Sequence, residues 1–207
     1  MLSSDHSTTL AGEAELVPAN CFAPVDFEQI YRRRAPVEVD LGCGDGSFLA
    51  AIAAENPSAD FLGIEGLAGR VRATCRRIER GGLTNARVLR FELSYAIQRL
   101  VPGNSVTVFH LMFPDPWPKR RHARRRLVNE NFLGLLHRAL VPNGTVRIAT
   151  DETDYFRQIS GLTSDSPLFT TIADSAPACA MSKFERRFTQ EGINIHRLVL
   201  RKVSPVT

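Results

Sequence analysis

The chain has 207 residues, 43% of them hydrophobic, and a formal net charge of +4 from 26 Lys and Arg against 22 Asp and Glu. This length suits a single domain with one well-filled core. Its four cysteines show no CxxC or Cys/His ligand spacing, so we expect neither a disulfide framework nor a metal site. Without signal-peptide features or an apolar run of 18 residues, the sequence predicts a cytoplasmic protein with no membrane partner.

The positive charge is concentrated in one place. Residues 119–126, KRRHARRR, hold six of the cations, so the remaining residues sum to −2. A local cluster of this kind indicates an anionic partner that docks at one site.

From Val37 onward, short apolar runs alternate with segments of helical periodicity. In the first such helix the apolar residues Phe48, Leu49, Ile52 and Ala53 share a face, and Ser47 is the expected N-cap. This alternation predicts an α/β domain of Rossmann-like type, with a mostly parallel twisted sheet and helices on both faces. The expected strands are 37–41, 60–65, 86–91, 105–113 and 145–150, and the expected helices are 47–57, 67–82, 94–100, 124–140 and 151–160.

The two ends of the chain have a different character. Residues 1–16 are small and polar, and we expect a flexible tail there. Near the other end, FERRFTQ (184–190) and INIHRLVLRKV (193–203) are expected to pair as an antiparallel C-terminal hairpin at the sheet edge. No repeat or linker interrupts the chain, so we treat residues 1–207 as one domain.

A glycine-rich loop, GCGDG, follows the first predicted strand. Gly42, Gly44 and Gly46 allow positive φ angles and close approach of the backbone to a ligand. The spacing is GxGxG, whereas a dinucleotide fingerprint would place its third glycine at position 47, which is Ser. Ligands of such sheets bind at the carboxyl ends of the strands, where this loop lies.

Three acidic residues stand at the ends of three successive strands. Asp40 precedes the glycine loop and can offset the positive charge of S-adenosylmethionine (SAM). Glu65 is placed to accept hydrogen bonds from ribose hydroxyls, and Glu92 to reach the adenine amine. Together with GxGxG, these acids favour SAM, and a nicotinamide dinucleotide is the alternative.

The fourth strand runs into FPDPWPK. Pro114 and Pro116 fix two φ angles and bias Phe113 and Asp115 toward extended conformations, so that the Asp115 carboxylate is preorganised. The basic run that follows lies where a phosphate backbone would be held while one base enters the site. The substrate expected from these residues is a nucleic acid.

The set VEVDLGCGDGSFL, FLGIEG, LMFPDPWPKRRHARRR, IATD and KFERR resembles the bacterial tRNA (guanine-N7)-methyltransferase family, with agreeing order and spacing from about Phe27 to the end. The resemblance implies a class I SAM-dependent methyltransferase that converts guanine 46 in the tRNA variable loop to 7-methylguanosine. It further implies no metal, and we expect a monomer or a weak homodimer.

The same resemblance assigns roles to individual residues. Asp40, Glu65, Glu92 and Asp115 match the acids of the SAM site, and Asp115 is also the catalytic position. The substrate-contacting positions are Lys119, Asp151, Ser182, Lys183, Phe184 and Glu185, and the RNA-interacting stretch includes Arg121, His122, Arg124, Arg125 and Arg126. Asp40, Glu92 and Ser182 depart from the family pattern, in which Glu, Asp and Thr are usual.

Two functions of other classes stay open at this point. One is an RNA-binding protein with a vestigial SAM site, which the intact acids Asp40, Glu65 and Asp115 disfavour. The other is a methyltransferase of small molecules, which leaves the basic run unexplained. The sequence does not decide whether Trp117 stacks on a base or fills the core.

Overall fold

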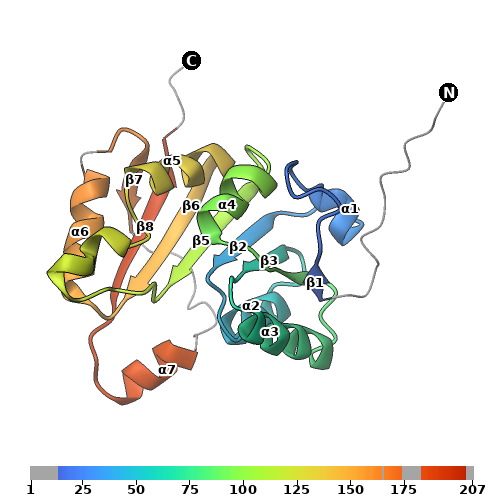
Figure 1. Ribbon diagram of the computed structural model, residues 1–207, viewed down its shortest axis with the longest axis horizontal. Coiled ribbons are helices and arrows are strands. Elements are labelled where there is room, and N and C mark those ends of the chain that lie inside the picture. Colours follow the sequence, from blue (N-terminus) through green and yellow to red (C-terminus); the bar gives the residue numbers. More distant parts are fainter. Residues whose placement is uncertain (1–13, 165, 174–182, 204–207) are drawn as a thin grey trace.

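The computed structural model describes residues 14–164, 166–173 and 183–203, which form a mixed eight-stranded sheet with helices on both faces (Figure 1). The strand order is β1-β4-β3-β2-β5-β6-β8-β7; β1 to β6 run parallel to one another, and β8 is antiparallel to both β6 and β7. The strands are β1 (Glu15–Leu16), β2 (Val37–Leu41), β3 (Asp60–Ile64), β4 (Ala86–Leu89), β5 (Val106–Met112), β6 (Leu140–Thr150), β7 (Phe169–Ile172) and β8 (His196–Lys202). The Rossmann-like α/β class expected from the sequence is confirmed.

Helices pack on this sheet through two separate apolar cores. Helices on one face contribute Phe27, Ile97, Phe132 and Tyr155, whereas α2 and α3 on the other face contribute residues such as Phe48 and Val71. The helices are α1 (Phe27–Tyr31), α2 (Ser47–Glu55), α3 (Ala68–Arg80), α4 (Leu93–Tyr95), the π-helix η1 (Ala96–Leu100), the 3₁₀-helix η2 (Arg120–Arg125), α5 (Glu130–Ala139), α6 (Thr153–Ser164) and α7 (Lys183–Gln190).

The order of the strands reverses at β2. From β2 the chain builds outward through β3 to β4, and it then crosses back to place β5 on the other side of β2. The loops after β2 and β5 therefore separate at the carboxyl edge of the sheet, which is where α/β sheets of this type bind ligands.

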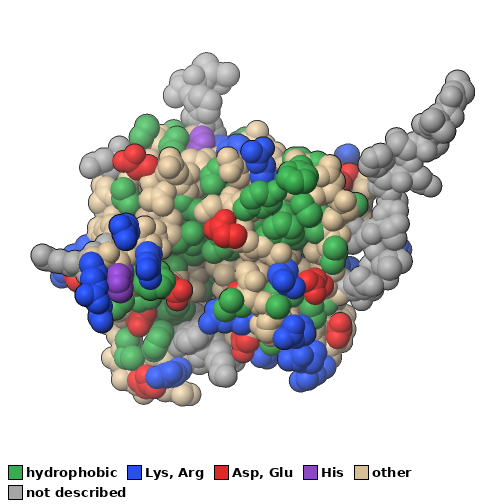
Figure 2. Space-filling view, in the orientation of Figure 1, with side chains coloured by type: hydrophobic (Ala, Val, Ile, Leu, Met, Phe, Trp, Pro, Cys, Tyr) green, Lys and Arg blue, Asp and Glu red, His purple; other side chains and the backbone are tan. Residues whose placement is uncertain are grey.

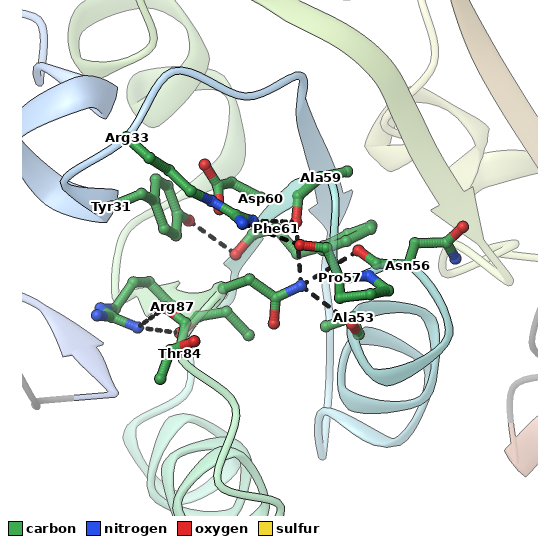
Figure 3. Close-up of polar contacts among 12 residues, drawn as sticks. Tyr31, Arg33, Ala53, Asn56, Pro57, Ala59, Asp60, Phe61, Thr84 and Arg87 are labelled. Atoms are coloured by element: carbon green, nitrogen blue, oxygen red, sulfur yellow. Dashed lines mark hydrogen bonds and ion pairs between the residues drawn. The ribbon is translucent and has the colours of Figure 1, made fainter.

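The amino ends of β3 and β4 carry a polar network with a structural role (Figure 3). The Arg33 guanidinium donates to the buried Asp60 carboxylate at 2.7 Å, and the Tyr31 hydroxyl donates to a β3 backbone oxygen at 2.8 Å. The Asn85 side chain donates to the backbone oxygens of Ala53 in α2 and of Ala59 before β3, and the Arg87 guanidinium donates to those of Thr84 and Ala86 at the start of β4. Because these side chains join α1, α2, β3 and β4 through hydrogen bonds, the network braces the end of the sheet opposite the candidate site.

Several boundaries differ from the expected ones. FERRFTQ is helical, in α7, and the antiparallel pair at the C-terminal edge is formed by β7 and β8. The predicted helix 124–140 begins only at Glu130, because Asn129 caps it and the preceding basic run is the separate 3₁₀-helix η2. The N-cap of α2 is Gly46 instead of Ser47, whose amide donates to the Asp45 carboxylate at 3.0 Å.

The expectation of a flexible tail is wrong for residues 14–16. Residues 1–13 lie outside the described part of the chain, but Ala14 and Leu16 are buried and β1 pairs in parallel with β4. Two buried apolar side chains, Ala14 and Leu16, suffice for this edge strand, and an apolar pattern of only two residues does not reveal a strand in the sequence.

Candidate active site and nucleic-acid interface

The glycine loop adopts the conformation that only glycine accepts readily. Gly42, Gly44 and Gly46 have φ angles of 75°, 59° and 73°. At Gly46 a side chain is also sterically excluded, since a Cβ would lie 2.6 Å from the Thr74 side chain of α3. The Thr74 hydroxyl in turn donates to the Gly44 carbonyl oxygen at 3.1 Å, so the loop is clamped onto α3.

Two buried carboxylates border this loop. Glu65, which is 5% exposed, accepts hydrogen bonds from the amides of Gly44 at 3.2 Å and Leu67 at 2.8 Å, and its carboxylate lies 3.7 Å from the Arg70 guanidinium. Asp40 is 3% exposed, and its Oδ2 has no hydrogen-bond partner among the described residues. Burial, and next the nearby charge of Glu65, raise the pKa of Asp40 to about 7. A buried carboxylate without a partner suits a ligand that brings positive charge.

Two adjoining clefts open at the carboxyl edge of the sheet. The first has a volume of about 410 Å³, and the residues that line it but not the second include Glu65, Leu93, Trp117 and Arg125. The second, of about 420 Å³, is lined by Asp40, the glycine loop, Phe48 and Arg187. The residues common to both are Gly42, Arg70, Met112, Phe113 and Asp115. Asp115 therefore lies at the junction of the two clefts.

Asp115 lies in the FPDPW loop (residues 113–117), whose conformation and tertiary hydrogen bonds the sequence did not indicate. Phe113 has a φ angle of 54°, so the predicted extended conformation is wrong for this residue. The chain must turn out of β5 at this point, and the Phe113 amide still donates to Ala149 of the neighbouring strand at 2.8 Å. Further along, Arg126 Nε donates to the Pro116 carbonyl at 2.7 Å. Tertiary hydrogen bonds on both sides, together with the two prolines, fix the position of exposed Asp115.

Trp117 neither fills the core nor offers two free faces. It lines the first cleft, the Arg125 guanidinium lies 4.9 Å from its ring centre, and the His122 ring contacts it edge-on at 5.8 Å. The cation–π contact fixes Arg125 beside the cleft.

Comparisons with known proteins agree with this geometry. A family model described as "Putative methyltransferase" matches residues 34–198. The tRNA (guanine-N(7)-)-methyltransferase of Nitrosomonas eutropha is 38% identical to this chain, with 87% of the chain and 83% of that protein covered. The protein of the same name from Syntrophotalea carbinolica is 35% identical, with 84% and 77% covered. The chain belongs to the tRNA (guanine-N7)-methyltransferase family.

Solved structures agree on the fold of this family member. The 16S rRNA methyltransferase KamB superposes with a TM-score of 0.61 at 18% identity, over 89% of this chain and 95% of that one. The antibiotic-resistance methyltransferase Kmr gives 0.57 at 18% identity, over 88% and 93%. At this identity the likeness concerns the fold alone, and it confirms the expected class I methyltransferase architecture.

The predicted RNA-interacting stretch divides into two parts. Lys119, Arg121, Arg124 and Arg125 are exposed, whereas Arg126 points inward. Besides its bond to Pro116, Arg126 donates to Gln158 of α6 at 2.6 Å and lies over the Tyr155 ring at 4.9 Å. Arg126 therefore ties the FPDPW loop to α6, and the exposed cations are the ones that can meet a phosphate backbone.

The other predicted site residues lie in different surroundings. Glu92 is exposed and caps α4 by accepting from the amides of Ser94 and Tyr95, and it lines neither cleft. Asp151 is exposed at the end of β6, also outside the lining of the two clefts. Ser182 lies outside the described residues, and Lys183, Phe184 and Glu185 form the start of α7.

Two cationic residues at the site had not been predicted. Arg70, in the first turn of α3, lines both clefts, and its place after the Glu65 strand end was a usable signal. Arg187 reaches the second cleft from α7, a helix that Phe188 docks against Phe113 with ring centres 5.2 Å apart. The resemblance assigned the preceding Lys183, Phe184 and Glu185 to substrate contact but gave no role to Arg187, and only tertiary packing brings α7 to this cleft.

The described residues contain neither a metal-binding cluster nor a helix able to span a membrane. Across residues 14–164, 166–173 and 183–203 no group of three His, Cys, Asp or Glu side chains is arranged to hold a metal ion. None of the helices formed by these residues has the length and apolar character needed to cross a membrane.

Proposed function

We propose that this protein transfers the methyl group of SAM to N7 of guanine 46 in the variable loop of tRNA and so forms 7-methylguanosine. The observation that carries the proposal is the position of Asp115, at the junction of a cleft bordered by Asp40 and the glycine loop with a cleft bordered by Trp117 and Arg125. The names of the relatives support tRNA as the substrate and guanine N7 as the acceptor.

The residues around the glycine loop fit SAM. Its positive charge matches the buried Asp40 carboxylate, which has an oxygen without a partner in the described part of the chain. The loop glycines leave the backbone open to close approach, and Glu65 supplies carboxylate oxygens beside it. When bound, SAM supplies an electrophilic methyl group on a sulfonium centre.

The acceptor chemistry requires little from the protein beyond position and charge. N7 of guanine has an in-plane lone pair and no proton to lose, so no general base is needed. Positive charge develops on the purine as the new bond forms. We assign Asp115 to accept hydrogen bonds from the guanine edge and to stabilise that charge, because a carboxylate fixed in advance needs no reorganisation during the reaction.

The remaining predicted residues act on the RNA. Lys119, Arg121, Arg124 and Arg125 are exposed near the same edge and would hold backbone phosphates around the target guanine. Asp151, Ser182, Lys183, Phe184 and Glu185 are proposed to orient the target base, as the resemblance implies.

The deciding experiment is incubation of the protein with bulk tRNA and methyl-labelled SAM, followed by nucleoside analysis. We expect label in 7-methylguanosine, and loss of this label from a tRNA transcript whose guanine 46 is replaced by adenine. Label in another nucleoside would refute the assigned acceptor atom. SAM binding without any transfer to tRNA would instead favour an RNA-binding protein with a vestigial SAM site.

A further inference from the structure

A second basic surface lies on α3, separate from the 119–126 run. The 13 residues of this helix contain five arginines and one acidic residue, so α3 carries a formal charge of +4. Since residues 119–126 carry +6 and the whole chain +4, everything outside these two segments sums to −6. The basic character of the protein therefore resides in two segments and not in one.

The arginines of α3 divide according to the direction in which they point. Val71, Thr74 and Ile78 form the buried side of the helix. Arg70 and Arg77 point toward the glycine loop, since Arg70 lines both clefts and Arg77 pairs with Asp45 of the loop at 3.1 Å. The other three, Arg72, Arg76 and Arg80, recur every fourth residue and are all exposed. We call them the α3 arginine stripe.

The structure shows no intramolecular polar contact of the stripe within the described part of the chain. None of its three guanidinium groups forms an ion pair or a hydrogen bond with another of the described residues, in contrast to Arg70 and Arg77. Two of its spacings also place like charges at i and i+4, an arrangement that costs roughly 0.2–0.5 kcal/mol per pair in an isolated helix. A helix face that keeps this repulsion suits a partner with many negative charges.

The position of α3 relates the stripe to the proposed substrate. Arg70 at the start of α3 and Arg125 of η2 line the same first cleft, so the two basic segments lie on opposite sides of it. Among the Lys and Arg side chains on the face viewed in Figure 2, one group lies over η2 at the left and another over α3 at the lower right. The stripe leads away from the cleft and covers about 12 Å along the helix axis at 1.5 Å per residue.

We propose that the α3 arginine stripe binds backbone phosphates of the tRNA at a distance from the methylated base, on the side of the cleft opposite η2. This inference rests on the proposed function. It assigns to the enzyme a second electrostatic contact with the body of the RNA. Such a contact explains how a single guanine is presented in the context of a folded tRNA, because two separated backbone contacts define orientation whereas one does not.

The test compares two variants with the same change in charge. In one, Arg72, Arg76 and Arg80 are all replaced by Gln. In the control, the exposed arginines Arg34, Arg99 and Arg201, which lie outside α3 and η2, are replaced by Gln. The dissociation constant for full-length tRNA is measured between 50 and 200 mM salt, and a short stem-loop that carries the target guanine is titrated in parallel.

We expect the stripe variant to bind full-length tRNA about tenfold more weakly at the lower salt, with the slope of log K against log salt reduced by roughly 2, since each lost phosphate contact lowers it by roughly 0.7–0.9. Its affinity for the stem-loop, its SAM affinity and its melting temperature should equal those of the wild type. The control variant should keep the wild-type slope.

Two results would overturn the inference. One is an unchanged slope for full-length tRNA in the stripe variant, and the other is an equal loss of affinity for tRNA and stem-loop, which would place the contact at the base itself. Either result leaves the proposed function intact as long as the wild-type protein still forms 7-methylguanosine in tRNA. Absence of that product would refute the proposed function independently of the stripe.

Discussion

At the scale of single residues, the environment of each carboxylate separates roles that the sequence presents as alike. Asp40 and Glu65 are buried beside the glycine loop, Asp115 is exposed between the two clefts, and Glu92 caps a helix. A buried acid without a partner suits a cationic ligand, whereas an exposed and fixed one is available to a substrate base. The four acids of the expected SAM site are therefore not equivalent.

Asp115→Asn tests the role of the exposed carboxylate. We expect tRNA and SAM binding to stay near wild-type values and the single-turnover rate of methyl transfer to fall by roughly 10²–10³, in line with the loss of one electrostatic contact to the transition state. Asp154→Asn, at an exposed acid of α6, serves as the control and should keep the full rate. A near-normal rate for Asp115→Asn would remove the charge of this residue from the mechanism.

At the scale of elements, the glycine loop and α3 act as one unit. Because Gly46 has a φ angle of 73° and a Cβ there would lie 2.6 Å from Thr74, Gly46→Ala strains the backbone and separates the loop from the helix. We expect the free energy of unfolding to fall by roughly 2 kcal/mol, a size typical of strain at a special φ/ψ position, and SAM affinity to fall with it.

Urea denaturation and calorimetric titration with SAM measure both effects. Gly134→Ala is the matched control, since it lies in α5 where a Cβ meets nothing within 4 Å, and it should leave stability equal or higher. If Gly46→Ala retained wild-type stability and SAM affinity, the close packing of the glycine loop on α3 would contribute to neither property.

The basic segment around η2 provides an element-scale prediction of its own. Arg126 donates to Pro116 and Gln158, so Arg126→Gln should destabilise the FPDPW loop, lower the melting temperature and slow methyl transfer. Arg124→Gln should leave the melting temperature unchanged but lower the salt slope of tRNA binding by roughly 0.7–0.9, as expected for one phosphate contact. Thermal melts beside salt titrations distinguish the two, and an identical phenotype for both variants would contradict the division of this segment.

At the scale of the whole molecule, the site is built at a cost in stability that depends on pH. Burial and the charge of Glu65 raise the pKa of Asp40 from 3.8 to about 7. The folded state therefore holds this proton more tightly than the unfolded state does. The contribution of Asp40 to stability is fully present below about pH 4 and is lost as pH rises through about 7, a total of up to about 4 kcal/mol.

Asp40→Asn should remove this part of the pH dependence. Between pH 5 and pH 8 the free energy of unfolding of the wild type should fall more than that of the variant, as measured by urea denaturation at both values. His110 is the register partner of Asp40 on β5, and it is hydrogen-bonded to Glu38 at 2.6 Å. The wild type and the variant both retain this His110–Glu38 pair, so any pH dependence that it contributes is the same in the two proteins. Equal pH dependence in the two proteins would show that Asp40 is ionised in the folded state across this range.

The same carboxylate should link SAM binding to pH. Positive charge beside Asp40 favours its ionised form, so SAM affinity of the wild type should increase as pH rises from 6 to 8, with release of a proton on binding. Calorimetric titrations in buffers of different ionisation enthalpy measure that proton. The absence of proton release would place the positive charge of the ligand away from Asp40.

The sequence by itself determined the sheet class, the glycine loop, the ends of β2 and β5 as the candidate site, and the family. These features depend on local signals: apolar runs set the strands, positive φ angles require glycine at 42, 44 and 46, and charge density marks residues 119–126. The same local reasoning placed Asp40, Glu65 and Asp115 at one edge of the sheet, which the structure bears out.

Only the tertiary structure decided which of these groups face the clefts and which support them. Glu92 is engaged by the amides of α4, Arg126 by Pro116 and Gln158, and FERRFTQ is a helix that docks on the FPDPW loop. The Arg126–Gln158 and Phe188–Phe113 contacts join residues more than 30 positions apart, and the role of Glu92 depends on a choice between a solvent-exposed and a capping rotamer. Hydrophobic periodicity carries no information about either. Long-range hydrogen bonds and packing, which form only when the sheet is complete, therefore set the final roles of the residues that the sequence had brought together.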